Sequence, residues 1–170
     1  TYWKADINYN QSRNFNKLGK TGESYDAINK ALVTSPNEPV YILQLSLVDG
    51  KPETILKAFK ITPLNQNARK LIINFLVNNS DKNPDYLTSA ENILKESIDL
   101  FPNDPKVYYQ MAIVKIKQNS VDEAIGSLEK SIELKSNYKE GRFLLGSIYK
   151  DLKNSEKAKL QFEYILKNID

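Results

Sequence analysis

The sequence predicts an all-α protein, an α-solenoid of about five stacked antiparallel helix pairs. A column of small residues recurs every 34 positions, at Ala90, Ala124 and Ala158. Bulky residues follow four positions later, at Leu94, Leu128 and Phe162. The next two columns, three and four positions on, are Ser97, Ser131 and Ile165, and then Ile98, Ile132 and Leu166. Together the four columns have the spacing of one helix face. Short polar turns, "QNS" and "KNS", precede these helices, and such turns join antiparallel helices. No stretch has the alternating pattern of a strand.

The first three units are 5–36, 37–63 and 64–102. The first contains the turn "KLGK". The second is short, with 27 residues from Pro36 to Pro63, but its turn at residues 50–52 still indicates a hairpin. The third is long, with 39 residues from Pro63 to Pro102, and carries its surplus in a predicted loop at 78–87. Asn83 and Pro84 are suited to start its second helix.

The last two units are 103–136 and 137–170, and we interpret all five as a single solenoid domain, 1–170. Asp104 followed by Pro105 is a typical helix start, a capping residue and then a proline. Ser120 and Glu123 have the spacing of a capping box.

Composition excludes several functional classes. The 170 residues are 41% hydrophobic and 26% charged, as in an ordinary soluble domain. A net charge of +3 with three arginines is too weak to indicate nucleic acid. The longest apolar runs are far shorter than the roughly 20 residues of a membrane helix. We therefore expect no nucleic-acid partner and no direct membrane insertion of this segment.

We expect no enzyme activity, catalytic residue, metal or cofactor. Cysteine and histidine are both absent, which removes thiol nucleophiles, Cys/His zinc sites and Ser-His dyads. The segment "GKTGES" contains the Gly-Lys-Thr sequence found in phosphate-binding loops. It lacks the upstream glycine and the preceding strand of such loops, so it is interpreted as a turn. Asp122 and Glu123 fall in a first helical turn, where the helix dipole favours acids.

The pattern resembles the tetratricopeptide repeat, a 34-residue helix-turn-helix unit. The fourth unit matches at Ala112, Ala124, Leu128 and Ser131, with Ser136 where proline is usual. The last unit matches at Gly146, Ala158 and Phe162, while Ile165 departs from the expected small residue. In the first unit, Ser24 replaces the expected alanine. The resemblance covers about residues 5–170 and implies a right-handed superhelix whose first helices line a concave groove.

The resemblance also implies a function, a non-catalytic scaffold that binds a peptide or partner protein in the groove. The fifth and ninth residues of the first helices are the predicted groove positions: Tyr9, Arg13, Leu43, Leu47, Lys70, Asn74, Tyr109, Ile113, Phe143 and Ser147. Some family members hold a peptide carboxylate with Lys and Asn side chains. Lys70 and Asn74 match that spacing, but Glu140 stands where a cation is needed, so we expect no such clamp.

The two ends leave alternatives open. Trp3 precedes the first predicted helix, and nothing follows to cover the last pair. The chain also begins at Thr1 rather than Met. We favour a piece of a longer protein over self-association through uncapped ends. The segment is similar to bacterial repeat tails, including those of envelope membrane enzymes such as O-antigen ligase-like or polymerase-like proteins, where it would position a partner or aid assembly. The compartment is then the bacterial cytoplasm or the outer side of the envelope membrane. A sugar-binding groove is a weaker alternative.

Overall fold

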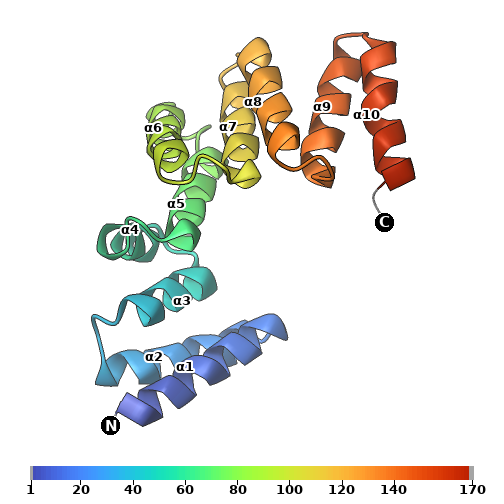
Figure 1. Cartoon of the computed structure of the whole chain (residues 1–170). Helices are drawn as coiled ribbons and strands as arrows, with labels where there is room; N and C mark the ends of the chain where they lie inside the picture. Colours follow the sequence, from blue (N-terminus) through green and yellow to red (C-terminus); the bar gives the residue numbers. More distant parts are fainter. Residues whose placement is uncertain (1, 169–170) are drawn as a thin grey trace. The chain divides into compact units, whose positions relative to one another are not determined.

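A computed structural model describes residues 2–168, and they form helices and the turns between them. The helices are α1 (Tyr2–Lys17), α2 (Thr21–Thr34), α3 (Pro39–Asp49), α4 (Pro52–Ile61), α5 (Gln66–Asn78), α6 (Asp85–Leu100), α7 (Pro105–Lys117), α8 (Val121–Leu134), α9 (Lys139–Asp151) and α10 (Ser155–Asn168). Figure 1 shows them in chain order. The described residues contain ten helices and no strand, which confirms the all-α fold class.

The structure divides into two compact units, Thr1–Phe75 and Leu76–Asp170, and each is described by itself. In the first unit α1 packs against α2 and α3, and α3 packs against α4. One buried cluster joins Ala5 of α1, Ile28 and Ala31 of α2, and Tyr41 of α3. A second consists of Ile42, Leu43, Ala58 and Ala68. Helix pairs in this unit therefore share buried walls, although the arrangement of residues 1–170 as one continuous domain stays a prediction.

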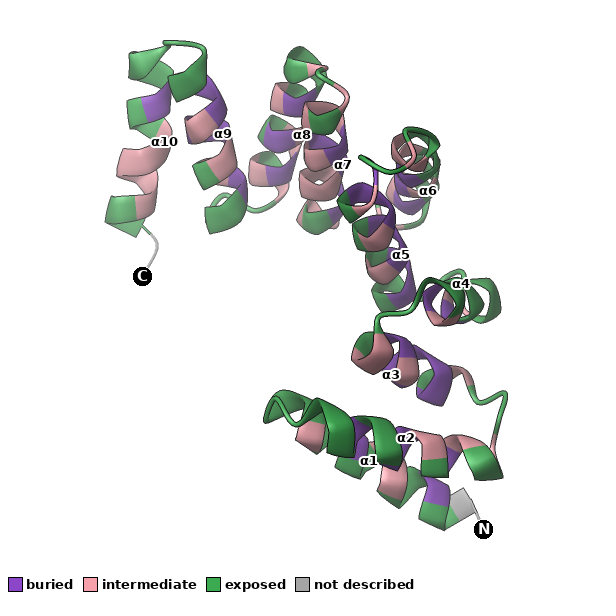
Figure 2. Cartoon of the chain, turned by 180° about the vertical axis from the view of Figure 1, so that it is seen from behind, coloured by how far each residue is buried: buried purple, intermediate pink, exposed green. Residues whose placement is uncertain are grey.

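In the second unit each helix from α6 to α10 packs against the next in chain order. The core cluster consists of Ala112, Ala124, Leu128, Leu145, Ile148, Tyr149 and Ala158. The small column at Ala90, Ala124 and Ala158 is buried, and so are Leu94 and Leu128, whereas Phe162 is half-buried against the cluster. Figure 2 colours the buried residues of each helix purple. Burial of these apolar faces supplies the main favourable term for folding, and no single hairpin could bury them alone.

A second small position, Ala112 in α7 and Gly146 in α9, faces close helix contacts. A Cβ atom added at Gly146 of α9 would lie 2.8 Å from Cε1 of Phe162 in α10. The equivalent residue one repeat earlier is Ala112, which is fully buried in the same core cluster as Leu128. The bulkier ring at Phe162 therefore accompanies the smaller residue at Gly146.

Helix starts and turns agree with most of the sequence signals. The Asp104 carboxylate accepts a hydrogen bond from the Lys106 backbone N–H at 3.0 Å, as a capping residue does. Gly19 and Gly50 adopt positive φ angles of 71° and 60°, which glycine reaches without steric cost. The inserted loop is shorter than predicted, because α5 ends at Asn78 and α6 begins at Asp85.

Two local predictions are wrong. Ser120 precedes α8, but its side chain makes no capping hydrogen bond. Glu123 instead pairs with Lys115 at 2.7 Å, because a charged amine attracts the carboxylate more strongly than a neutral amide does. Trp3 lies within α1 rather than ahead of it, since the helix already begins at Tyr2.

The fourth residue of a first helix fastens the preceding loop in three places. The Arg69 Nε donates to the Pro63 carbonyl, and the Tyr108 hydroxyl donates to the Pro102 carbonyl at 3.0 Å. The Arg142 Nε donates to the Ser136 carbonyl at 2.6 Å. In each case the acceptor is six residues earlier, so Ser136 fills the role of the usual proline through its backbone oxygen.

A buried polar contact explains why Ser24 replaces alanine. The Ser24 hydroxyl donates to the Ser12 carbonyl at 2.9 Å and lies 3.0 Å from the Ser12 hydroxyl. The Gln44 amide adds a third element by donating to the Ser12 hydroxyl at 3.2 Å. The two buried hydroxyls and the Gln44 amide therefore satisfy one another's hydrogen bonds and connect α1, α2 and α3.

Candidate partner-binding surface

The ten predicted groove residues are divided between the two units. Those of α1, α3 and the first part of α5 lie in the Thr1–Phe75 unit: Tyr9, Arg13, Leu43, Leu47, Lys70 and Asn74. Those of α7 and α9 lie in the Leu76–Asp170 unit: Tyr109, Ile113, Phe143 and Ser147. Each set is therefore considered separately.

In the first unit two of the predicted groove residues, Tyr9 and Arg13, contact each other. The Arg13 guanidinium lies 5.6 Å above the Tyr9 ring, and the Tyr9 ring lies 5.3 Å from that of Tyr41. Leu43 is only 9% exposed and packs in the core, so it offers little surface to a partner. Leu47 is exposed on the same helix.

Tyr41 of α3 connects α3 to α1 beside Tyr9 and Arg13. Its hydroxyl donates to the Asp6 carboxylate at 2.6 Å. That hydrogen bond, with burial and the Asp6 charge, raises the pKa of Tyr41 to about 12. The phenol therefore stays protonated at neutral pH and fixes α3 against α1 beside Tyr9.

In the second unit Tyr109 and Phe143 line one pocket of about 470 Å³, the concave pocket. Its lining residues come from α7, α9 and α10: Tyr109, Lys139, Glu140, Phe143, Leu144 and Ile165. Phe143 is 61% exposed, which is unusual for a large ring on a repeat core helix. Ile113 and Ser147 do not line the pocket, and the Ser147 hydroxyl donates to the Phe143 carbonyl of its own helix at 2.9 Å.

Aromatic contacts stiffen the walls of this pocket. Tyr109 and Tyr138 meet edge to face with ring centroids 5.5 Å apart, and Phe143 lies 5.9 Å from Phe162. Burial, and then the Glu140 charge, raises the pKa of Tyr138 to about 12 and also raises the pKa of Tyr109. Both phenols are therefore neutral donors at physiological pH.

The sequence reasoning missed part of this pocket. Glu140 and Leu144, the second and sixth residues of α9, line the pocket but are not among the predicted fifth and ninth positions. Ile165 departs from the small residue that the repeat pattern predicts, and it also lines the pocket. That departure is the signal that marks the pocket.

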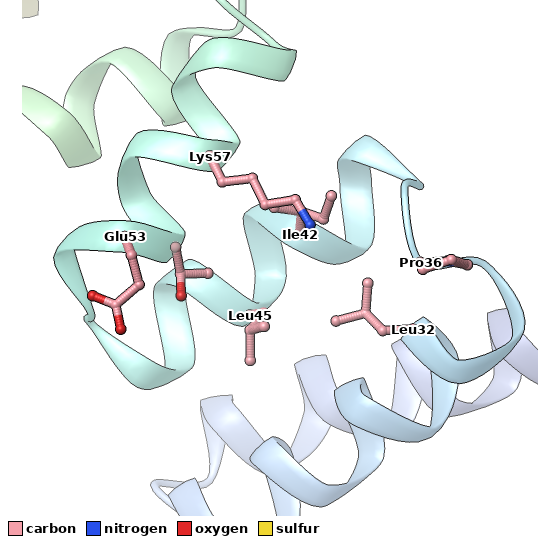
Figure 3. A pocket seen from close by; sticks show the side chains of 7 residues that line it. Leu32, Pro36, Ile42, Leu45, Glu53 and Lys57 are labelled. Carbon is pink, nitrogen blue, oxygen red and sulfur yellow. The ribbon is translucent and has the colours of Figure 1, made fainter.

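Two further pockets have other lining residues, one pocket in each unit. One of about 350 Å³ lies in the first unit between α2, α3 and α4, and is lined by Leu32, Pro36, Ile42, Leu45, Glu53, Thr54 and Lys57. Figure 3 shows Lys57 extending from α4 toward Ile42, with Glu53 further along the same helix. None of the predicted groove residues lines it.

The other, of about 500 Å³, lies between α6, α7 and α8 and has a charged rim. Glu91 is the centre of that rim, 2.7 Å from Lys95 and 3.1 Å from Lys115, and it accepts from Gln118 at 2.9 Å. The hydrogen bonds from Lys95 and Gln118 lower the pKa of Glu91 to about 2. These contacts connect α6 to α7 and leave the Glu91 carboxylate fully engaged.

The described residues contain neither a candidate membrane span nor a candidate metal cluster. Within residues 2–168 no helix has both the length and the apolarity to cross a bilayer. The same residues hold no group of three or more acidic, cysteine or histidine side chains placed to bind a metal ion.

Comparisons with known proteins identify the repeat. A family model for the tetratricopeptide repeat matches residues 105–138 and 140–167. These are the two helix pairs α7–α8 and α9–α10, whose columns carry the resemblance most clearly. No curated protein sequence matches the chain.

Solved structures share the fold at low sequence identity. A fragment of MamA from Desulfovibrio magneticus superposes with a TM-score of 0.75 at 15% identity, covering 96% of this chain and 93% of that one. A thermophilic repeat protein of Thermus thermophilus gives 0.72 at 18% identity, with coverage of 97% and 91%. The pilF protein of Pseudomonas aeruginosa gives 0.77 at 16% identity, with coverage of 98% and 77%. At such identities the similarity shows the fold alone.

Proposed function

Because this chain carries tetratricopeptide repeats and has the helical fold that they build, we propose that it is a non-catalytic scaffold for another protein. The partner's peptide segment binds on the face formed by the first helices. The concave pocket of α7, α9 and α10 is the observation that carries this function, since it joins two predicted groove residues, Tyr109 and Phe143, in one solvent-open hollow.

The chemistry of this surface suits protein recognition. Aromatic side chains with one polar end contribute a large share of binding energy in protein interfaces. Phe143 is already largely solvent-exposed, so covering it on binding removes apolar area from water without unpacking the core. In the first unit, Tyr9 with Arg13 offers a second aromatic and cationic surface of the same kind.

The test is capture of the native partner from cells of the source organism after crosslinking, with wild type and Phe143→Ser compared. The matched control is Leu152→Ser, which replaces another exposed apolar side chain of the same unit that does not line the concave pocket. We expect the partner to be lost with Phe143→Ser and kept with Leu152→Ser. Equal recovery of the partner with both variants would refute binding at the concave pocket.

A second candidate function is that of an accessory tail on a larger envelope membrane protein, such as an O-antigen ligase-like or polymerase-like enzyme. It depends on the sequence resemblance alone. The gene upstream of Thr1 decides it, since about ten hydrophobic spans support the tail and an immediate start codon excludes it.

A second copy of this chain, bound through the ends of the helical array, is the other candidate partner. Leu166 of α10 is 84% exposed, which gives this candidate its physical basis. Light scattering with chromatography tests it, because a monomer at high concentration excludes it.

A further inference from the structure

We infer that the concave pocket of the second unit is an anchor subsite, which takes one large apolar side chain of an extended peptide segment from the partner protein. The inference depends on the proposed function and specifies the chemistry of what that surface recognises. Its central residue is Ile165, which was not among the predicted groove positions.

The repeat itself shows what Ile165 changes. One repeat earlier the equivalent residue is Ser131, whose hydroxyl donates to the Pro105 carbonyl at 2.7 Å and ties α8 to the start of α7. The residue equivalent to Pro105 is Lys139, at the start of α9. Isoleucine cannot make that hydrogen bond, and Ile165 instead forms an apolar wall beside Lys139 in the pocket. At Ile165 the hydrogen bond between the two helices of the pair is therefore replaced by apolar surface that is open to solvent.

The other walls continue this apolar surface. Phe143 and Leu144 of α9 and the ring of Tyr109 from α7 complete the lining. Tyr109 is held by Tyr138 and Phe143 by Phe162, so the walls are largely preformed before a ligand arrives. A preformed apolar hollow with few polar groups is the usual form of a site for one buried side chain.

The charges at the rim favour a peptide over a polyanion or a polycation. Lys139 and Glu140 are adjacent and of opposite sign, and neither forms an ion pair with another residue of 2–168. Together they add no net charge. A peptide main chain matches such a pair, because its N–H can donate to the Glu140 carboxylate and its carbonyl can accept from the Lys139 amine. A peptide held by these two groups would have its apolar side chain next to the walls of the pocket.

The experiment uses random dodecapeptides displayed on phage and selected on the whole chain, followed by titration of the best fluorescein-labelled peptide. Ile165→Ser restores the residue of the preceding repeat and so keeps the helix pair compatible with folding. Leu166→Ser is the matched control, since Leu166 is adjacent but does not line the pocket. Phe143→Ser is a second pocket variant at an exposed position, and circular dichroism verifies that all three remain helical.

We expect the selected peptides to share one large apolar residue. Ile165→Ser, Phe143→Ser and replacement of that peptide residue by alanine should each weaken binding at least about tenfold, the usual effect of losing a hot-spot contact. Leu166→Ser should change the affinity less than about twofold.

The other outcomes overturn the inference in distinguishable ways. Selected peptides that bind equally well to the Ile165→Ser and Phe143→Ser variants refute the anchor subsite and leave the scaffold function standing. A chain that selects no peptide above background refutes the proposed function and the subsite together. A dimer in light scattering that Ile165→Ser dissociates assigns the pocket to a second copy of this chain, which also refutes the inference.

Discussion

Replacing Gly146 by alanine should destabilise the protein, although the same change stabilises most helices. Glycine inside a helix costs about 1 kcal/mol relative to alanine, so the propensity term favours the variant by that amount. Against it, the new Cβ would lie 2.8 and 2.9 Å from two ring atoms of Phe162 and 3.2 Å from Cβ of Gln161. Ordinary contacts are longer than 3.4 Å, so the ring must move by more than half an ångström. Overpacking of this kind costs about 1–3 kcal/mol, which leaves a net loss of about 1 kcal/mol.

A double-mutant cycle separates the two terms. In a Phe162→Leu background the pair becomes alanine facing leucine, the combination present at Ala112 and Leu128 one repeat earlier. There Gly146→Ala should stabilise by up to about 1 kcal/mol, because the ring contacts are removed and only the 3.2 Å contact with Cβ of Gln161 still opposes the propensity term. Gly126→Ala on α8 is the matched control and should also stabilise, since nothing lies within 4 Å of its added Cβ. The assay is urea unfolding followed by circular dichroism. Stabilisation by Gly146→Ala in both backgrounds would refute the reasoning.

Three further predictions concern the contacts between helices. Ser24→Ala should cost about 1 kcal/mol in urea unfolding, because the buried Ser12 carbonyl loses a donor; no loss would contradict the polar tie. Leu128→Ala should cost about 2–5 kcal/mol, because the side chain is fully buried, and a loss below 1 kcal/mol would show that α8 does not pack as described. The pKa of Glu91 is lowered to about 2 from 4.5, so its stabilisation is complete above pH 4.5 and is lost as pH falls toward 2. Glu91→Gln should therefore cost about 1–2 kcal/mol at pH 7 and nearly nothing at pH 2, with equal costs at both pH values as the contradicting result.

The periodic pattern predicted the fold because burial in a repeat array is local. Each hairpin needs only a small column and a bulky column to fit the next, so Ala124 and Leu128 could be placed in the core without knowing their partners. Helix capping was harder to predict from the sequence, because a capping side chain can form a stronger interaction with another residue nearby. Glu123 has the capping spacing, but Lys115, from the preceding helix, attracts it into an ion pair instead.

The candidate site was predicted in outline and missed in detail. Tyr109 and Phe143 follow from the repeat register, which fixes the direction of a side chain on a helix. Leu43 occupies the same register position as they do, yet it is buried, because the packing of the short repeat decides how much of each position is covered. Ile165 could be identified as a departure from the pattern, but its place beside Lys139 required the three-dimensional contact between α9 and α10.

Isoleucine methyl NMR during titration with a selected peptide tests the central claim most directly, because each of the three pockets described above contains one isoleucine. Ile165 lines the concave pocket, Ile42 the pocket between α2, α3 and α4, and Ile98 the charged pocket between α6, α7 and α8. Binding on the face of the first helices should shift the Ile165 methyl signals and leave those of Ile42 and Ile98 in place. Shifts at Ile42 or Ile98 with Ile165 unmoved would contradict the account.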